Sequence, residues 1–322
     1  MLSYLGWVAY LFFGYYIFRA VCHTVFHAYV YFYAPMKDLK KLAKTDWAAV
    51  TGATDGIGKQ YAIQLAKQGM NLVLISRTQS KLDDVREEIL KLNPNIKIET
   101  IAFDFTDTSP ESYEKILRQP MKKVGFLVNN VGGVYEIPDR LHEVKGGLAE
   151  QKQVVDLNLI PAFCLCSIVL KYMKERGGGT IVNVGSIAGS VTFVYVSAYG
   201  ATKTALEKFS HILRVEYPEV YIQHLTPGWI VTKFSKKMKP TFFDLTAEEY
   251  VKYAVKTVGW VNDTRGHYAQ QLQFDIITSL PMWLQDFLME KSLKAKREEN
   301  VEFIRLRELQ ENNNVAKNGK LE

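Results

Sequence analysis

The sequence contains few cysteines and no group of residues spaced to bind a metal ion. Only three of the 322 residues are cysteine: Cys22, Cys164 and Cys166. The last two lie in one apolar helical stretch, residues 161–173, so a disulfide framework is excluded and a reducing compartment is expected around the folded domain. His23 and His27 are one helical turn apart, but no further ligands accompany them, and we predict no metal site.

Long basic runs are also missing. The net charge is only +6, and no basic cluster has interleaved aromatic side chains, so the sequence predicts no nucleic-acid partner. A mildly basic chain suits an anionic membrane surface or an acidic substrate, although a solvated basic face explains the same balance. Internal repeats are absent as well. With 48% hydrophobic residues, a chain of this length can bury one large core, which favours one domain plus appendages over two domains.

Charge is absent from the N-terminal segment. Residues 2–18 carry no charged side chain, Arg19 interrupts, and residues 20–34 are again mostly apolar. A run of this length predicts a transmembrane segment. A cleaved signal peptide is the alternative, but it needs a basic start and a small-residue cleavage site, and both are missing. Positive charges follow the uncharged run and predict a cytoplasmic location for the rest of the chain; they are Arg19, Lys37, Lys40, Lys41 and Lys44.

A glycine-rich turn lies between a predicted strand and a predicted helix. Residues 46–51 form an apolar run of strand length, and residues 59–69 have helical periodicity that ends at a glycine. This arrangement presents backbone N–H groups and a helix N-terminus to a pyrophosphate. A glycine triplet alone is weak evidence, but the flanking elements support a dinucleotide site. Its candidate residues are Gly52, Gly56, Ile57 and Gly58.

The end of the next predicted strand, residues 71–77, concerns the choice of cofactor. A free ribose 2′-hydroxyl would call for Asp or Glu here, about 20 residues past the glycines. The sequence has Ser76 and Arg77 instead. A guanidinium matches the oxygens of a 2′-phosphate in geometry and charge, which favours NADPH over NADH. A solvated arginine at a strand end is the simpler alternative.

Tyr199 and Lys203 lie four residues apart, and Ser186 precedes them in Val184-Gly-Ser-Ile-Ala-Gly189. Residues four apart share one face of a helix. An isolated tyrosine titrates near about 10, too high for acid–base chemistry at neutral pH, and a neighbouring ammonium lowers that pKa. Ser186 adds a hydroxyl that can hold a substrate oxygen. A tyrosine and a lysine four residues apart are common in amphipathic helices. The glycine turn earlier in the chain makes a functional pair the better interpretation here.

Strand-like runs alternate with helical runs from Trp47 to about Trp229. This alternation predicts a mainly parallel sheet with helices on both faces. The expected fold class is therefore α/β, a Rossmann-like doubly wound sheet in a single domain that carries an N-terminal membrane segment.

The motifs resemble, in order and spacing, those of the short-chain dehydrogenases/reductases over roughly residues 45–260. Two departures stand out. Val131 occupies a position where alanine is usual, and Trp229 is bulkier than the usual aliphatic residue. The motifs that carry the resemblance are Thr51-Gly-x-x-x-Gly-Ile-Gly58, Asn129-Asn-Val-Gly132, Asn158, Ser186, Tyr199-x-x-x-Lys203 and Pro227-Gly228.

This resemblance implies roles for single residues. Tyr199 exchanges a proton with the substrate oxygen, and Ser186 hydrogen-bonds that oxygen. Lys203 lowers the pKa of Tyr199 and binds the nicotinamide ribose, while Asn158 supports a water relay to Lys203. The hydride comes from the cofactor. The cofactor contacts implied besides the glycine turn, Tyr199 and Lys203 are Arg77, Asp104 near the adenine, Asn129, which ties down the central sheet, and Thr232.

A narrower resemblance is to the membrane-bound branch with the 17β-hydroxysteroid dehydrogenases types 3 and 12, the latter also being very-long-chain 3-oxoacyl-CoA reductases. It rests on the apolar N-terminus, on residues 250–259 and on Ser279-Leu-Pro-Met-Trp283. It implies NADPH-dependent ketone reduction on a large hydrophobic substrate, foremost 3-oxoacyl-CoA in very-long-chain fatty-acid elongation. A hydroxysteroid or other sterol is the alternative substrate, and a non-catalytic membrane scaffold is the second alternative function. Residue types do not separate acyl-CoA from steroid.

The expected organisation has three parts. Residues 1–44 form a membrane anchor and basic linker, residues 45–290 the catalytic domain with an apolar substrate cover from about residue 234, and residues 291–322 a polar helix and tail. Residues 272–289 are apolar but interrupted by charged residues and a proline, which favours a membrane-lying or core-capping segment over a span. The resemblance also implies the endoplasmic reticulum membrane, a cytosolic catalytic domain, and homodimer or elongation-complex partners.

Overall fold

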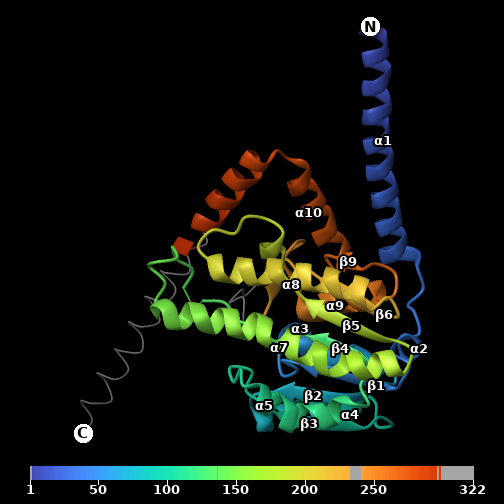
Figure 1. Cartoon of the computed structure of the whole chain (residues 1–322), viewed down its shortest axis with the longest axis vertical. Coiled ribbons are helices and arrows are strands. Elements are labelled where there is room, and N and C mark those ends of the chain that lie inside the picture. The colour runs from blue at the N-terminus through green and yellow to red at the C-terminus, as the bar shows by residue number, and fades with distance from the viewer. Residues whose placement is uncertain (1, 136, 233–240, 296, 299–322) are drawn as a thin grey trace.

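The computed structural model describes residues 2–135, 137–232, 241–295 and 297–298, and its centre is a seven-stranded parallel sheet (Figure 1). The strand order is β3-β2-β1-β4-β5-β6-β9. This order reverses between β1 and β4, where open sheets of this kind bind their ligands. The strands are β1 (Trp47–Thr51), β2 (Asn71–Ser76), β3 (Ile98–Ala102), β4 (Phe126–Asn129), β5 (Gly179–Val184), β6 (Val220–Leu225) and β9 (Asp263–Thr264). A separate parallel pair joins β7 (Ile230–Val231) to β8 (Leu245–Thr246).

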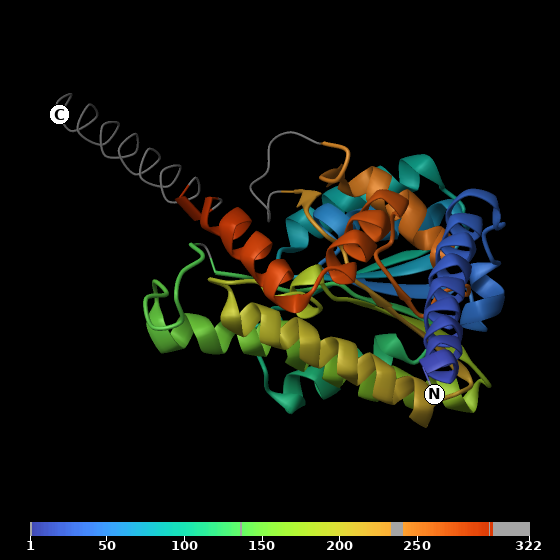
Figure 2. The same cartoon turned by 90° about the horizontal axis from the view of Figure 1, so that it is seen from above.

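Helices cover both faces of the sheet, which Figure 2 shows nearly edge-on between two helical layers. A hydrophobic core lies on each face of the sheet, and alternate residues of a strand pack into opposite cores. In β1, Ala48 and Val50 pack into one core and Ala49 into the other, as expected for a strand that is buried on both faces. One layer contains α3 (Gly56–Lys67), α4 (Gln79–Leu92) and α9 (Ala247–Ala254). The other contains α5 (Pro110–Ser112), η2 (Tyr113–Leu117), α6 (Arg118–Met121), α7 (Gly147–Glu175) and α8 (Ser197–Glu216). The predicted doubly wound α/β fold is confirmed.

The N-terminal helix α1 (Leu2–Ala28) projects from the domain and continues into a π-helical turn, η1 (Tyr29–Tyr33) (Figure 1). Arg19 does not interrupt α1, and its guanidinium lies 5.8 Å from the centre of the Tyr15 ring. Among the described residues two helices are long and apolar enough to cross a membrane: residues 6–33, whose apolar stretch is unburied, and α7. Half of the apolar stretch of α7 is buried, because α7 is a core helix of the domain.

The segment after α1 is packed on the domain. The hydroxyl groups of Tyr31 and Thr264 are 2.8 Å apart in a buried hydrogen bond, and Trp260 Nε1 donates to Pro35 O at 3.0 Å. The short helix α2 (Leu39–Ala43) contributes Leu39 and Ala43 to the core. These contacts fix the base of α1 relative to the sheet.

The C-terminal part folds into a helical hairpin. After η4 (Val255–Thr257) and β9, α10 (Tyr268–Ser279) rises to a turn at Pro281, and residues 282–295 form a second helix. We call α10 and residues 282–295 the C-terminal hairpin. Its turn lies on the same side of the domain as the projecting α1 (Figure 1). The predicted start of the substrate cover near residue 234 and the predicted tail over residues 299–322 lie outside the described residues.

The glycine turn between β1 and α3 depends on close packing. Gly52 and Gly56 have φ of +63° and +54°, a region that disfavours other residues. The Asp55 carboxylate accepts from Gly56 N at 2.9 Å and caps α3. A Cβ on Gly58 would lie 2.5 Å from Asn130 Nδ2 and closer still to Gly52 O. The start of α3 can therefore approach β1 and β4 only with glycine at position 58.

We expect Gly58→Ala to lower the free energy of unfolding by about 1–3 kcal/mol, because the added methyl group displaces backbone that cannot move aside. Chemical denaturation in detergent measures the change. Gly14→Ala is the matched control, since no atom lies within 4 Å of the added Cβ there. Equal stability of Gly58→Ala and the unchanged protein would contradict the packing.

Candidate active site

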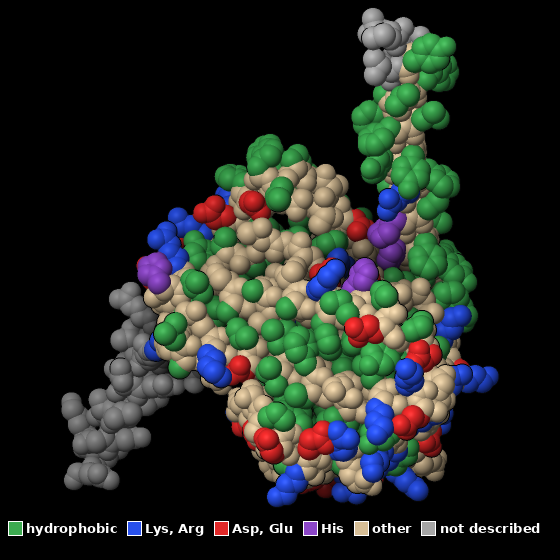
Figure 3. Space-filling view, in the orientation of Figure 1, with side chains coloured by type: hydrophobic (Ala, Val, Ile, Leu, Met, Phe, Trp, Pro, Cys, Tyr) green, Lys and Arg blue, Asp and Glu red, His purple; other side chains and the backbone are tan. Residues whose placement is uncertain are grey.

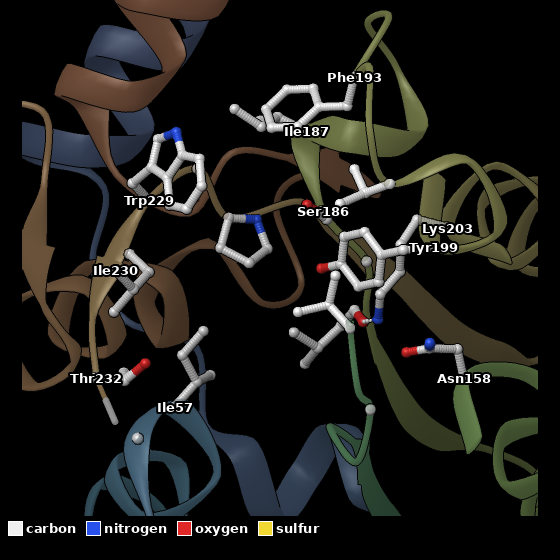
Figure 4. A pocket seen from close by; sticks show the side chains of 18 of the residues that line it. Ile57, Asn158, Ser186, Ile187, Phe193, Tyr199, Lys203, Trp229, Ile230 and Thr232 are labelled. Atoms are coloured by element: carbon white, nitrogen blue, oxygen red, sulfur yellow. Dashed lines mark hydrogen bonds between the residues drawn. The ribbon is translucent and has the colours of Figure 1, made fainter. Parts of the chain in front are cut away.

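A cavity of about 380 Å³ lies at the carboxyl ends of β1, β4, β5 and β6. Figure 4 shows Ser186, Tyr199, Lys203 and Asn158 along one wall, and Trp229 on the opposite wall. The polar side chains thus gather on one side, facing a mainly apolar remainder. The apolar side chains around it are Val131, Val134, Tyr135, Pro138, Ile187, Phe193, Val194, Val196, Ile230 and Leu293.

The reactive hydroxyls come from two elements that meet at the cavity. Tyr199 lies in the first turn of α8, and Ser186 follows β5, where its hydroxyl accepts from Ala188 N at 3.2 Å and caps the short helix η3 (Ile187–Gly189). The Ser186 hydroxyl also hydrogen-bonds Tyr199. The start of α8 is held by Tyr135, whose buried hydroxyl accepts from Ala198 N at 3.1 Å. Sequence reasoning missed Tyr135, which belongs to no recognised motif.

Burial dominates the electrostatics of this wall. It raises the pKa of Tyr199 from its ordinary value, and the hydrogen bond from Ser186 offsets part of the rise. Lys203 Nζ lies 5.6 Å from the centre of the Tyr199 ring and donates to Val184 O at 3.1 Å. Burial lowers the pKa of Lys203 to about 8. The ammonium is aimed at the backbone of β5 and is itself desolvated, and its effect on the pKa of Tyr199 stays a prediction.

Asn158 connects α7 to the loop after β4. Its Oδ1 accepts from Gly133 N at 3.2 Å, and its Nδ2 donates to Gly133 O at 2.7 Å and to Val154 O at 2.8 Å. A Cβ on Gly132 would lie 2.6 Å from Asn158 Oδ1 and 3.4 Å from Lys203 Nζ. The structure therefore brings Asn158 and Lys203 to the same glycine, and the water relay between them stays a prediction.

The neighbouring residues Asn129 and Asn130 differ in whether they line the cavity. Asn129, predicted as a cofactor contact, is buried away from the cavity, where Nδ2 donates to Asn183 Oδ1 at 2.9 Å and joins β4 to β5. Asn130 lines the cavity, and its Nδ2 donates to Thr51 O at 3.0 Å. The Thr51 hydroxyl accepts from Asn130 N at 2.9 Å and from Val131 N at 3.0 Å. Sequence reasoning chose Asn129 and passed over Asn130, although the motif contains both.

The other predicted cofactor residues divide into two groups. Arg77 follows β2 and Asp104 follows β3; both are exposed and outside the cavity. The Asp104 carboxylate accepts from Thr106 N at 3.0 Å and from the Thr106 hydroxyl at 2.8 Å. A ligand would reach Arg77 only by extending past the glycine turn along this edge of the sheet. Of the predicted cofactor residues in and after the glycine turn, Gly52, Gly56, Ile57 and Thr232 line the cavity and Gly58 does not.

The far end of the cavity is built by distant parts of the chain. Phe193 and Trp229 have ring centres 6.3 Å apart. Buried Gln270 of α10 accepts from Gly228 N at 2.8 Å and donates to Trp229 O at 3.2 Å, which holds the loop that carries Trp229. Leu293 and Arg297 complete the wall from the C-terminal hairpin and the residues just after it. No local signal in that polar helical run points to either residue.

Among the described residues, no group of three or more His, Cys, Asp or Glu side chains is placed to hold a metal ion. The absence of a metal stays a prediction.

Comparison with known families decides the classification. The family model for short chain dehydrogenases matches residues 46–242. The chain belongs to the short-chain dehydrogenase family. It is an oxidoreductase that acts on an alcohol or ketone group. This membership agrees with the order of motifs and with the strand order of the sheet.

Several relatives are similar over most of the chain. A very-long-chain 3-oxoacyl-CoA reductase from Caenorhabditis briggsae is 42% identical over 78% of this chain and 81% of its own. The human very-long-chain 3-oxoacyl-CoA reductase is 40% identical over 74% and 77%. A putative steroid dehydrogenase from Caenorhabditis elegans is 39% identical over 80% and 82%. The narrower predicted resemblance is therefore confirmed, and both kinds of substrate appear among the names.

Solved structures agree on the fold. L-Sorbose reductase from Gluconobacter frateurii, solved with NADPH and L-sorbose, superposes with a TM-score of 0.60 over 70% of this chain and 97% of its own, at 21% identity. A putative gluconate 5-dehydrogenase from Beutenbergia cavernae, solved with NADP, is 26% identical, with a TM-score of 0.58 over 66% and 88%.

We expect Lys203→Met to raise the free energy of unfolding at pH 7. Because burial lowers the pKa of Lys203 from 10.5 to about 8, the unfolded chain binds this proton more tightly than the folded one. The buried ammonium therefore destabilises the folded protein by its full amount below pH 8. This destabilisation disappears as the pH rises to 10.5. The gain is up to about 3 kcal/mol, less the roughly 1 kcal/mol of the lost hydrogen bond to Val184 O.

Denaturant unfolding without added cofactor at pH 7, 9 and 10.5 measures this gain. Lys208→Met, exposed on the same helix, is the control and should show no gain that depends on pH in this range. A Lys203→Met protein less stable than the unchanged one at pH 7 would rule out a desolvated ammonium at this site.

Proposed function

We propose that this protein uses NADPH to reduce a ketone on a large hydrophobic substrate, with 3-oxoacyl-CoA of very-long-chain fatty-acid elongation as the favoured substrate. One observation carries the proposal. The hydrogen-bonded hydroxyls of Ser186 and Tyr199 line a cavity whose remaining wall is mainly apolar. The names of the relatives that are 42% and 40% identical support the acyl-CoA.

The residues present fit a dinucleotide. Gly52 and Gly56 line the cavity, and a Cβ at these positions would crowd Asn130 Nδ2 at 2.9 Å and Thr232 Cγ2 at 3.1 Å respectively. The twelve-residue helix α3 begins at Gly56 and Ile57, which line the cavity, and a helix N-terminus suits a pyrophosphate. Ile57 and Thr232 would flank the cofactor, and Lys203 would bind the nicotinamide ribose. A bound nicotinamide supplies the hydride.

The protein groups then handle the proton and the developing charge. Ser186 and Tyr199 hold the carbonyl oxygen between their hydroxyls, and Tyr199 donates its proton as the carbonyl is reduced. The raised pKa of Tyr199 keeps the phenol protonated at neutral pH, as a proton donor requires. The Lys203 ammonium, 5.6 Å from the Tyr199 ring, stabilises the phenolate that remains. Asn158 keeps the loop after β4 in place beside Lys203.

The same site would serve a hydroxysteroid or another sterol, and the relatives named steroid dehydrogenases, at 39% identity, favour that second candidate. A non-catalytic membrane scaffold has no use for Tyr199 beside Lys203, so we rank it last. Assay of the purified protein with NADPH against both a 3-oxoacyl-CoA and a steroid ketone separates the three. If only the steroid ketone is reduced, a steroid replaces 3-oxoacyl-CoA as the proposed substrate. If neither compound is reduced, the scaffold function is favoured.

We expect Tyr199→Phe to remove nearly all turnover and to leave NADPH binding close to normal, because only the phenol oxygen carries the proton. Steady-state assays and cofactor titration measure the two effects. Tyr217→Phe, at the far end of α8, is the control and should keep full activity. Full turnover by Tyr199→Phe would remove Tyr199 from the mechanism.

We expect Arg77→Asp to shift the preference from NADPH toward NADH. The change deletes the guanidinium that would bind the 2′-phosphate, and the new carboxylate repels phosphate but accepts from a ribose hydroxyl. The ratio of kcat/KM for the two cofactors measures the shift. Arg86→Asp, exposed on neighbouring α4, controls for the loss of charge alone. An unchanged ratio would mean that Arg77 does not select the cofactor.

We also propose that residues 1–44 anchor the protein in the endoplasmic reticulum membrane and that the catalytic domain, residues 45–290, is cytosolic. The unburied apolar helix and the positive charges that follow it support this topology. We expect protease added to sealed microsomes to digest the domain, while a lumenal marker stays intact. Protection of the domain without detergent, or glycosylation of exposed Asn262, would show the opposite topology.

A further inference from the structure

We propose that the tip of the C-terminal hairpin is a second membrane contact, which enters the interfacial layer of the same bilayer that α1 crosses. Membrane docking by this hairpin goes beyond the proposed reaction.

The hairpin exposes large apolar side chains on both arms. Leu272 and Ile276 on α10 are 52% and 56% exposed, and Met282, Trp283 and Phe287 on the second arm are 69%, 71% and 57% exposed. Figure 3 shows hydrophobic side chains gathered at the top of the hairpin and along α1, with charged side chains on the left shoulder of the hairpin and over the opposite end of the domain. A contiguous apolar surface of this kind marks an interaction site rather than ordinary solvent exposure.

The uncharged polar side chains near the tip have partners within the hairpin. The Thr278 hydroxyl donates to Phe274 O at 2.9 Å, and the Ser279 hydroxyl donates to Ile276 O at 2.7 Å. Gln285 Nε2 donates to Leu280 O at 2.7 Å across the turn. These bonds lower the cost of moving the tip into the interfacial layer, where the carboxylate of Asp286 can stay hydrated, since the hydroxyls and the amide already have partners.

The depth of the tip follows from its contacts with the N-terminal helix. His23 Nδ1 lies 4.0 Å from Asp275 Oδ2, so α1 and α10 are side by side at this level. From Asp275 the hairpin rises four residues to Ser279, and from His23 α1 rises four residues to Arg19, each a rise of about 6 Å. The tip therefore reaches about the level of Arg19, the first charged residue below the uncharged run. That level is the membrane interface for a helix anchored as α1 is.

Three features favour a bilayer over a protein as the occupant. The surface continues the apolar surface of α1 on the same side of the molecule (Figure 1). Trp283 at the tip is a residue type enriched at the headgroup level. Exposed Lys291 and Lys294 follow on the descending arm, where they would meet anionic headgroups.

The descending arm also reaches the cavity. Leu293 is buried in the cavity wall, and Arg297 Nη2, just beyond the arm, lies 2.6 Å from Asp139 Oδ1. An apolar molecule that leaves the bilayer at the tip thus meets the cavity along a single helix.

The test uses the full-length chain in sealed phosphatidylcholine–phosphatidylserine liposomes. In a Cys22→Ser, Cys164→Ser background, which retains buried Cys166, a nitroxide is attached at Met282→Cys, Leu272→Cys or, as the matched control, Leu92→Cys. Leu92 is 55% exposed at the end of α4, in the sheet domain. Electron paramagnetic resonance then compares collisions with apolar oxygen and with a water-soluble nickel chelate.

We expect the oxygen-to-nickel collision ratio at Met282 to exceed that at Leu92 several-fold, with Leu272 between them, because the tip enters first. Equal ratios at Met282 and Leu92 would overturn the proposal. Shielding of Met282 from both reagents would also overturn it, since a protein partner or a second copy of the chain would then cover the tip. A ratio higher at Leu272 than at Met282 would contradict entry by the tip.

Discussion

The contact between the glycine turn and the loop after β4 is the constraint on which the site depends. The Thr51 hydroxyl accepts hydrogen bonds from two backbone N–H groups of that loop. The side chain of Asn130 donates a hydrogen bond to Thr51 O. This exchange closes the point where the strand order reverses, so the glycine turn and the wall that carries Ser186 and Tyr199 share one edge of the sheet. Asn183, bonded to Asn129 and to Ser210 of α8, connects the same edge to the helix that carries Tyr199.

The burial of Tyr199 and Lys203 in the cavity wall is unfavourable in itself, and the packing around them compensates. Burial raises the pKa of Tyr199 and lowers that of Lys203, so the fold disfavours the charged form of both groups. In a ketone reductase the raised pKa makes Tyr199 a weaker acid, and a desolvated ammonium would offset this by acting strongly on the phenolate, because little water screens it. Strain of this kind is expected where function competes with stability.

Two apolar features on one side of the domain give the molecule an orientation. Helix α1 and the hairpin tip point the same way, and the helix that descends from the tip reaches the cavity wall at Leu293. A substrate with a long hydrocarbon part is concentrated in a bilayer rather than in water. If this side faces a membrane, as we propose, the cavity suits the hydrophobic substrate that the relatives' names suggest.

The sequence by itself determined the features that depend on short spacings: the strand–glycine turn–helix unit, the shared face of Tyr199 and Lys203, and the uncharged helix before the domain. Local periodicity and local sterics govern these. The tertiary structure alone decided which of Asn129 and Asn130 faces the cavity, because neighbouring residues at a strand end point to opposite sides. It also decided the direction of the Lys203 ammonium and the arrival of Leu293 and Arg297, since these depend on packing between segments far apart in the chain.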